Sequence, residues 1–147
     1  MADIKEEIIK SLNADLQLEH AARIQYLAHA EEVKGVNAEP VISRLKEIAG
    51  DEGGHEEKFR TLIGDYLGGI PAMGEAGTKP AKTLPEIFDA NMKNEKHAIE
   101  QYKQTYRMII DNRDQLLYVF ERLEHDMRHI IMDEEEHVTE LSRLMGI

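Results

Sequence analysis

The sequence contains no cysteine and no tryptophan, and only 5% of its residues are aromatic. Without cysteine, the chain forms no disulfide, no thiolate zinc site and no iron–sulfur cluster. The lack of thiols is compatible with the reducing cytosol.

Positive charge is also scarce, with 18 lysines and arginines against 29 aspartates and glutamates and a formal charge of −11. Nucleic acid is therefore not an expected partner, whereas a negative field attracts cations, including metal ions. No apolar run approaches the roughly 20 residues that span a bilayer. The start "MADIKEEIIKSLNADL" lacks the apolar segment of a signal peptide. We expect a cytoplasmic protein without a membrane partner.

What the sequence does contain is helical periodicity, in a chain of 147 residues that is long enough for a single domain, 1–147. Apolar side chains recur at steps of three and four residues in four stretches. These stretches cover approximately 3–33, 40–67, 83–110 and 116–145.

The breaks between these stretches differ in length. "KGVNAEP" ends the first, and Pro40 suits the first turn of the next helix. "GGIPAMGEAGTKPAK" at 68–82 has four glycines and two prolines, so it predicts a linker that spans the bundle. Thr83 begins a capping box, and "DNRD" at 111–114 predicts a short turn. The expected fold is all-α, a four-helix bundle of two helix pairs joined by one long crossover.

The first and third stretches repeat one motif inside the apolar stripe, Glu-x-x-Ala-x-x-Gln-Tyr. The first copy is Glu19, Ala22, Gln25 and Tyr26, and the second is Glu95, Ala98, Gln101 and Tyr102. The second and fourth stretches share Asp-Glu-x-x-His, as Asp51, Glu52 and His55 and as Asp133, Glu134 and His137. A glutamate and a histidine three residues apart lie on the same face of a helix.

Four glutamates on the bundle axis would be prohibitive without partners, because buried carboxylates protonate instead of remaining ionised. Two divalent cations would neutralise them, and two neutral imidazoles would complete the ligand set. One glutamate from each of two helices and Glu-x-x-His from each of the others is the di-metal carboxylate arrangement. The expected ligands are Glu19, Glu52, His55, Glu95, Glu134 and His137.

These residues resemble the ferritin-like superfamily of di-iron carboxylate proteins, and bacterioferritin and rubrerythrin most closely. The resemblance implies terminal ligands at Glu19 and Glu95, a bridging pair at Glu52 and Glu134, and terminal imidazoles at His55 and His137. It implies near-site tyrosines with a catalytic role at Tyr26 and Tyr102, and histidine-orienting carboxylates at Asp51 and Asp133.

The sequence departs from these relatives in four places. It has no rubredoxin cysteines, and Met92 and Ala98 stand where rubrerythrins carry another glutamate. Gly53 replaces the haem-ligating methionine of bacterioferritin, so no haem is expected. Only ten residues follow His137, so the fifth helix of ferritin cages is not expected.

The implied function is that of a di-iron oxidoreductase that binds two Fe(II) ions, with manganese as an alternative metal. It would oxidise them with O₂ or H₂O₂, as a ferroxidase or a peroxidase, and would need an external electron donor or fresh Fe(II). A homodimer is implied by resemblance. Iron storage or metal buffering, manganese catalase-like chemistry, oxidation of an organic substrate and a metal-free bundle are the alternatives.

Other residues have less specific interpretations. His20, His97, His125 and His129 are expected at the surface, although His125, His129 and Asp133 form a column that suits an adventitious metal. Gly50, Gly53 and Gly54 indicate either close helix packing or open space beside the metals.

Overall fold

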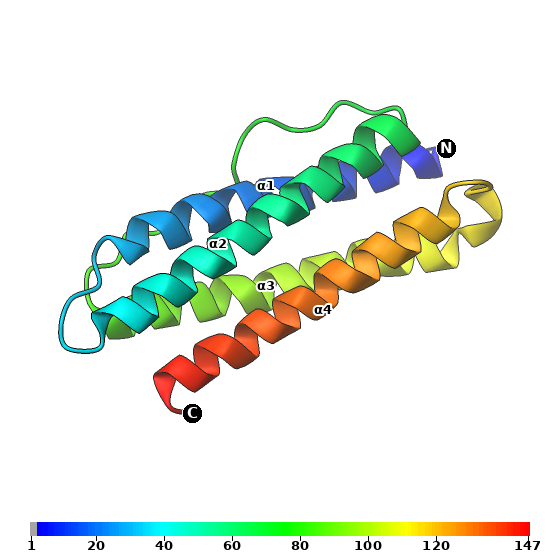
Figure 1. Ribbon diagram of the computed structural model, residues 1–147. Coiled ribbons are helices and arrows are strands. Elements are labelled where there is room, and N and C mark those ends of the chain that lie inside the picture. Colours follow the sequence, from blue (N-terminus) through cyan, green and yellow to red (C-terminus); the bar gives the residue numbers. More distant parts are fainter. Residues whose placement is uncertain (1–2) are drawn as a thin grey trace.

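The computed structural model describes residues 3–147, and within this range the chain forms four long helices and no strand. The helices lie side by side as a bundle, with α1 next to α2 and α3 next to α4 (Figure 1). This arrangement confirms the predicted all-α four-helix bundle. The helices are α1 (Ile4–Ala30), α2 (Ala38–Thr61), α3 (Leu84–Asp111) and α4 (Phe120–Met145).

Three helix ends differ from the predicted ones. The second α-helix ends at Thr61, and a π-helix, Leu62–Tyr66, continues the chain close to the predicted end at 67. The first helix ends at Ala30 and not near Val33, and the fourth begins at Phe120 and not at Leu116. Val33 and Leu116 are nevertheless buried, at 7% and 0% exposure. Their side chains continue the apolar pattern from within the segments that connect the helices, and periodicity does not distinguish such residues from helical ones.

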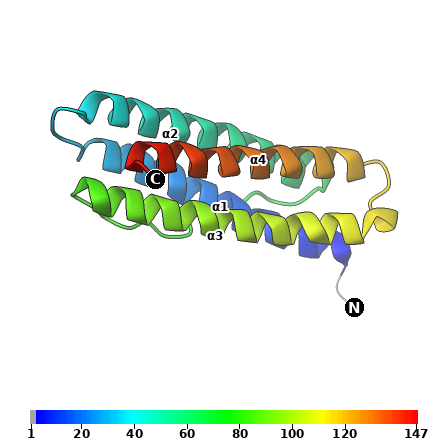
Figure 2. The same cartoon turned by 90° about the horizontal axis from the view of Figure 1, so that it is seen from below.

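The crossover between α2 and α3 returns along the length of the bundle, so α3 runs parallel to α2 (Figures 1 and 2). It lies against α1. Asn13 binds it twice, through the carbonyl of Ile70 at 3.0 Å and the amide of Ala72 at 2.8 Å. The amide of Ala76 donates to the carbonyl of Gln17 at 3.0 Å. These bonds satisfy backbone groups that an extended segment leaves unpaired.

Apolar side chains form two core clusters, one toward each end of the bundle. The first includes Leu12, Phe59 and Ile109, and the second includes Ile48 and Ile87. On each helix, the acidic residue of the repeated motifs falls between the two clusters. Among residues 3–147, no helix has the length and apolar character needed to cross a membrane.

Candidate metal centre

Six polar side chains from all four helices meet in the middle of the bundle, and each is between 0% and 3% exposed. The helical spacing explains their direction, since each occupies an inward position of its apolar stripe. They are the six residues that the sequence predicts as ligands: Glu19, Glu52, His55, Glu95, Glu134 and His137.

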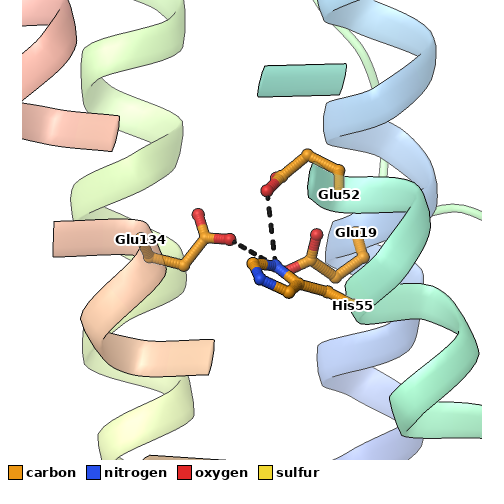
Figure 3. A group of neighbouring side chains, drawn as sticks. All are labelled: Glu19, Glu52, His55 and Glu134. Carbon is orange, nitrogen blue, oxygen red and sulfur yellow. Dashed lines mark hydrogen bonds and ion pairs between the residues drawn. The ribbon is translucent and has the colours of Figure 1, made fainter. Parts of the chain in front are cut away.

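The six residues form two overlapping groups of four. One group contains Glu19 and His55, and the other contains Glu95 and His137. Glu52 and Glu134 belong to both groups. Within each group the oxygen and nitrogen atoms lie within 4.8 Å of one another. Figure 3 shows the first group, in which Glu134 of α4 points toward the three side chains from α1 and α2.

Five buried atoms around these two centres lack hydrogen-bond partners, which is the strongest indication that the centres suit cations. Nδ1 of His55 lies 3.3 Å from Glu19, 3.5 Å from Glu52 and 2.9 Å from Glu134. A single ring nitrogen cannot donate to three carboxylates. Buried atoms without a hydrogen-bond partner are Glu19 Oε2, Glu52 Oε1, Glu95 Oε2, Glu134 Oε1 and His137 Nδ1. Divalent cations fit this donor set, and carboxylates with imidazoles suit iron and manganese.

Burial changes the ionisation of these groups. It raises the pKa of Glu19 to about 7, and repulsion from Glu134 adds to the effect. Burial also holds the pKa of Glu52 and of Glu95 well above the ordinary value. Burial opposes ionisation of Glu134 as well, but the adjacent Glu95 carboxyl and His137 imidazole hold its pKa well below 4.5. Without cations, the site therefore retains protons.

The ring nitrogen of each site histidine that points away from the carboxylates contacts an aspartate of a different helix. Nε2 of His55 on α2 lies 2.8 Å from Oδ2 of Asp133 on α4. Nε2 of His137 on α4 lies 3.0 Å from Oδ2 of Asp51 on α2. Both contacts leave Nδ1 facing the carboxylates. The predicted orienting aspartates thus contact the histidines, in a crossed arrangement.

The two tyrosines of the repeated motif also contact residues of the opposite half. Tyr26 donates to Oε1 of Glu95 at 2.7 Å, and Tyr102 donates to Oε1 of Glu19 at 2.7 Å. Both rings are 1% exposed. Burial, together with the neighbouring carboxylates, raises the pKa of both hydroxyls, so they remain protonated donors.

A cavity of about 240 Å³ leads toward the carboxylates between α1, α3 and the crossover. Its inner wall includes Glu52, Glu95, Glu134 and Tyr102. Alanines and crossover residues form much of the remaining wall, namely Ala21, Ala22, Ala98, Ala76 and Gly77. The three glycines of α2 are not part of it. A side-chain carbon at Gly50 or Gly54 would meet nothing within 4 Å, so close helix packing does not explain them.

The remaining histidines have different surroundings. His97 and His125 are exposed as predicted. The prediction that His20 lies exposed at the surface is wrong. Its side chain is only 14% exposed, and its Nδ1 lies 2.8 Å from the carbonyl of Gly74 in the crossover. Within the described chain, His125 and His129 do not form a metal-binding group with Asp133, which contacts His55 instead.

Several buried polar residues near the centre were not predicted. Asp15 and Asn91 lie on the inward faces of α1 and α3, four residues before Glu19 and Glu95. Their spacing from the two glutamates is the same in both helices. That repetition, read together with the glutamine of the motif, is the signal in the sequence that points to them.

Comparison with known proteins places these features in context. The family model described as "Ferritin-like domain" matches residues 9–146. A ferritin-like di-iron carboxylate protein from Bacillus anthracis superposes with a TM-score of 0.88 at 26% identity, over 98% of this chain and 99% of that chain. No curated protein matches the sequence significantly.

Two further solved structures share the fold. The bacterioferritin of Desulfovibrio desulfuricans, whose structure describes a di-iron site, has a TM-score of 0.84 and 26% identity, over 97% of this chain and 80% of that chain. A dodecameric thioferritin from Bacteroides fragilis has a TM-score of 0.81 and 22% identity, over 98% of this chain and 86% of that chain.

Proposed function

Because this chain belongs to the ferritin-like family, we propose that it binds two iron ions and oxidises Fe(II) with dioxygen or peroxide. The observation that carries the proposal is the pair of overlapping ligand groups that share Glu52 and Glu134. In this assignment Glu19 and His55 are the terminal ligands of one ion, and Glu95 and His137 are those of the other. Glu52 and Glu134, which belong to both groups, would be shared by the two ions.

Iron bound by these residues would supply the electrons that reduce dioxygen or peroxide. The protein residues fix the geometry around them. Asp133 and Asp51 accept hydrogen bonds from Nε2 of His55 and His137, which directs each Nδ1 toward the site. The hydroxyls of Tyr26 and Tyr102 hold one oxygen of each terminal glutamate and leave the other oxygen available. We assign both tyrosines to positioning.

The size of the cavity favours a small oxidant over an organic substrate. Pockets for drug-sized molecules usually measure roughly 300 to 1,000 Å³. The cavity beside the carboxylates measures about 240 Å³ and is lined by several alanines. It accommodates dioxygen or peroxide readily, which supports ferroxidase or peroxidase chemistry.

The partners follow from this chemistry. Repeated turnover needs either fresh Fe(II) or an external electron donor, since the sequence has no cysteine for an internal iron–sulfur or rubredoxin centre. Haem binding is not part of the proposal, because Gly53 stands where bacterioferritin has a methionine. A cytoplasmic homodimer stays a prediction.

The test is anaerobic loading with Fe(II) followed by stopped-flow mixing with O₂ or with H₂O₂. Fast oxidation by either oxidant supports the proposal, and the faster one distinguishes a ferroxidase from a peroxidase. Continued Fe(II) uptake beyond the first turnover would indicate storage. Fe(II) that oxidises no faster than free Fe(II) in the same buffer would contradict the proposal.

A further inference from the structure

A buried carboxyl group lies beside the candidate metal centre without belonging to it. Asp15 is 0% exposed and lies one turn before Glu19 on α1. Its Oδ1 accepts from Nε2 of Gln101 at 3.0 Å, and its Oδ2 accepts from Oγ1 of Thr105 at 2.7 Å. Both partners are neutral. Burial raises the pKa of Asp15 to about 8, and its carboxylate makes no hydrogen bond to the six site residues in the described chain.

The other half of the protein provides an internal comparison. Asn91 occupies the equivalent place on α3, four residues before Glu95. Its Oδ1 accepts from Nε2 of Gln25 at 3.0 Å, as Asp15 accepts from the matching glutamine. Its Nδ2 lies 2.9 Å from Nδ1 of His29. A neutral amide therefore satisfies this position in one half, so packing does not require an acid in the other.

A chain of hydroxyl groups connects Asp15 with partly exposed protein surface. Oγ of Ser11, which is half-buried, lies 2.5 Å from Oγ1 of Thr105. Hydroxyls both donate and accept hydrogen bonds. When Asp15 is ionised, Ser11 donates to Thr105, which donates to Asp15. When Asp15 is protonated, Asp15 donates to Thr105, which donates to Ser11. A proton can therefore pass between Asp15 and solvent through two hydroxyls that are already in contact.

We propose that Asp15 is a proton-exchanging residue that balances charge at the Glu19 half-site when metal ions are loaded. The inference rests on the proposed metal-binding function. Glu19 on α1 repels a charge on Asp15, and Tyr102 on α3 is the other titratable neighbour. In the described chain, no side chain of α2 or α4 is among the groups that perturb its ionisation. Cations bound at Glu19 remove that repulsion, and Asp15 becomes a carboxylate by releasing one proton through Thr105 and Ser11.

This exchange makes the two half-sites unequal. After loading, the Glu19 half has an additional carboxylate close by, whereas the Glu95 half has the uncharged Asn91. The additional negative charge favours the cation on its own side. The ion held by Glu19 and His55 is therefore bound more tightly, relative to the other ion, as the pH rises.

The test is calorimetric titration of the metal-free protein with Zn²⁺, which has no redox chemistry, at pH 7. Titration in two buffers with different ionisation heats gives the number of protons released. Metal binding to protonated ligands releases protons, and we expect Asp15→Asn to bind the same zinc but release about one proton fewer per chain. Asp126→Asn is the matched control, because Asp126 is buried but contacts His125 and Arg122 away from the site. It should release as many protons as the unmodified protein.

Equal proton release from the unmodified protein and Asp15→Asn, with two zinc ions bound to each, would overturn the role of Asp15 and leave the metal site intact. Absence of zinc binding by the unmodified protein would contradict both. Thr105→Val serves if Asp15→Asn does not fold, since it interrupts the hydroxyl chain and keeps the acid. Stopped-flow mixing with a pH indicator should then show several-fold slower proton release, and an unchanged rate would contradict the proposed route.

Discussion

Tyr26 on α1 donates a hydrogen bond to Glu95 on α3, with 2.7 Å between the hydroxyl and Oε1. Tyr102 makes the reciprocal bond to Glu19. Each tyrosine therefore supports the glutamate of the opposite half, although it shares a helix with the other one. The repeated motif places one such tyrosine and one such glutamate in each half, and the hydrogen bonds between them cross the bundle axis.

Removing these hydroxyls should weaken metal binding without abolishing it. Loss of a residue that orients a ligand typically costs 10- to 100-fold in metal affinity, and we expect about 10-fold at the affected half-site for Tyr26→Phe or Tyr102→Phe. Anaerobic Co²⁺ titration measures this. The control is Tyr106→Phe, whose hydroxyl binds Glu124 away from the centre. An equal effect of all three substitutions would contradict the specific role.

The shared glutamates should differ from the terminal ones in how many metal ions they hold. Glu52 belongs to both ligand groups and Glu19 to one. We expect Glu52→Ala to abolish paired binding and Glu19→Ala to leave one ion per chain, as measured by metal analysis after dialysis. Glu52→Ala should also raise the stability of the metal-free protein, because it removes a buried carboxyl. The exposed Glu136→Ala is the control. Unchanged stoichiometry in Glu52→Ala would refute the bridging assignment.

The crossed contacts between the aspartates and histidines make a distinctive prediction. Asp133→Asn should weaken the half-site that contains His55, and Asp51→Asn the one that contains His137, each by roughly 10-fold or more. Visible spectra of Co²⁺-loaded variants report which half-site has changed. The exposed Asp65→Asn should leave the spectra as they are. If Asp133→Asn instead weakened metal binding at the half-site of His137, and Asp51→Asn at that of His55, the crossed contacts would not be made in solution.

The six residues of the candidate centre were predictable because the same motifs occur on both sides of the bundle. Glutamate at an inward position of the helical stripe is costly, so its appearance four times in two repeated motifs predicted all six residues of the centre. The exchange of partners was not predictable, because helical periodicity specifies the inward face of a helix and not the neighbour that it contacts.

The same limitation explains the crossover and the helix ends. The glycines and prolines of 68–82 predicted a linker, but the attachment of that linker to Asn13 and His20 depends on packing. The apolar pattern predicts Leu116 in the fourth helix, but its backbone lies before the start of α4 although its side chain is buried.

The stability of the metal-free protein should fall as the pH rises. The pKa of Glu19 is about 7 in the folded state and 4.5 ordinarily, so the folded state keeps a proton that the unfolded chain loses. Burial opposes a charge on His137, but Glu134 and Glu95 raise its pKa from 6.5 to about 11, which extends the same trend.

Stability therefore falls from about pH 4.5 upward, and Glu19 contributes on the order of 3 kcal/mol. Urea unfolding of the metal-free protein at pH 5 and pH 8 should give the higher midpoint at pH 5. Added Zn²⁺ should raise the midpoint more at pH 8, because fewer protons compete with it. A midpoint that is higher at pH 8 without metal would contradict the protonation states assigned to these groups.

Anomalous diffraction from crystals of the Fe(II)-loaded protein tests the central claim most directly. We predict two iron peaks per chain, both in contact with Glu52 and Glu134. One should also contact Glu19 and His55, and the other Glu95 and His137. A single peak, or iron bound elsewhere on the protein with the six residues unliganded, would contradict the account.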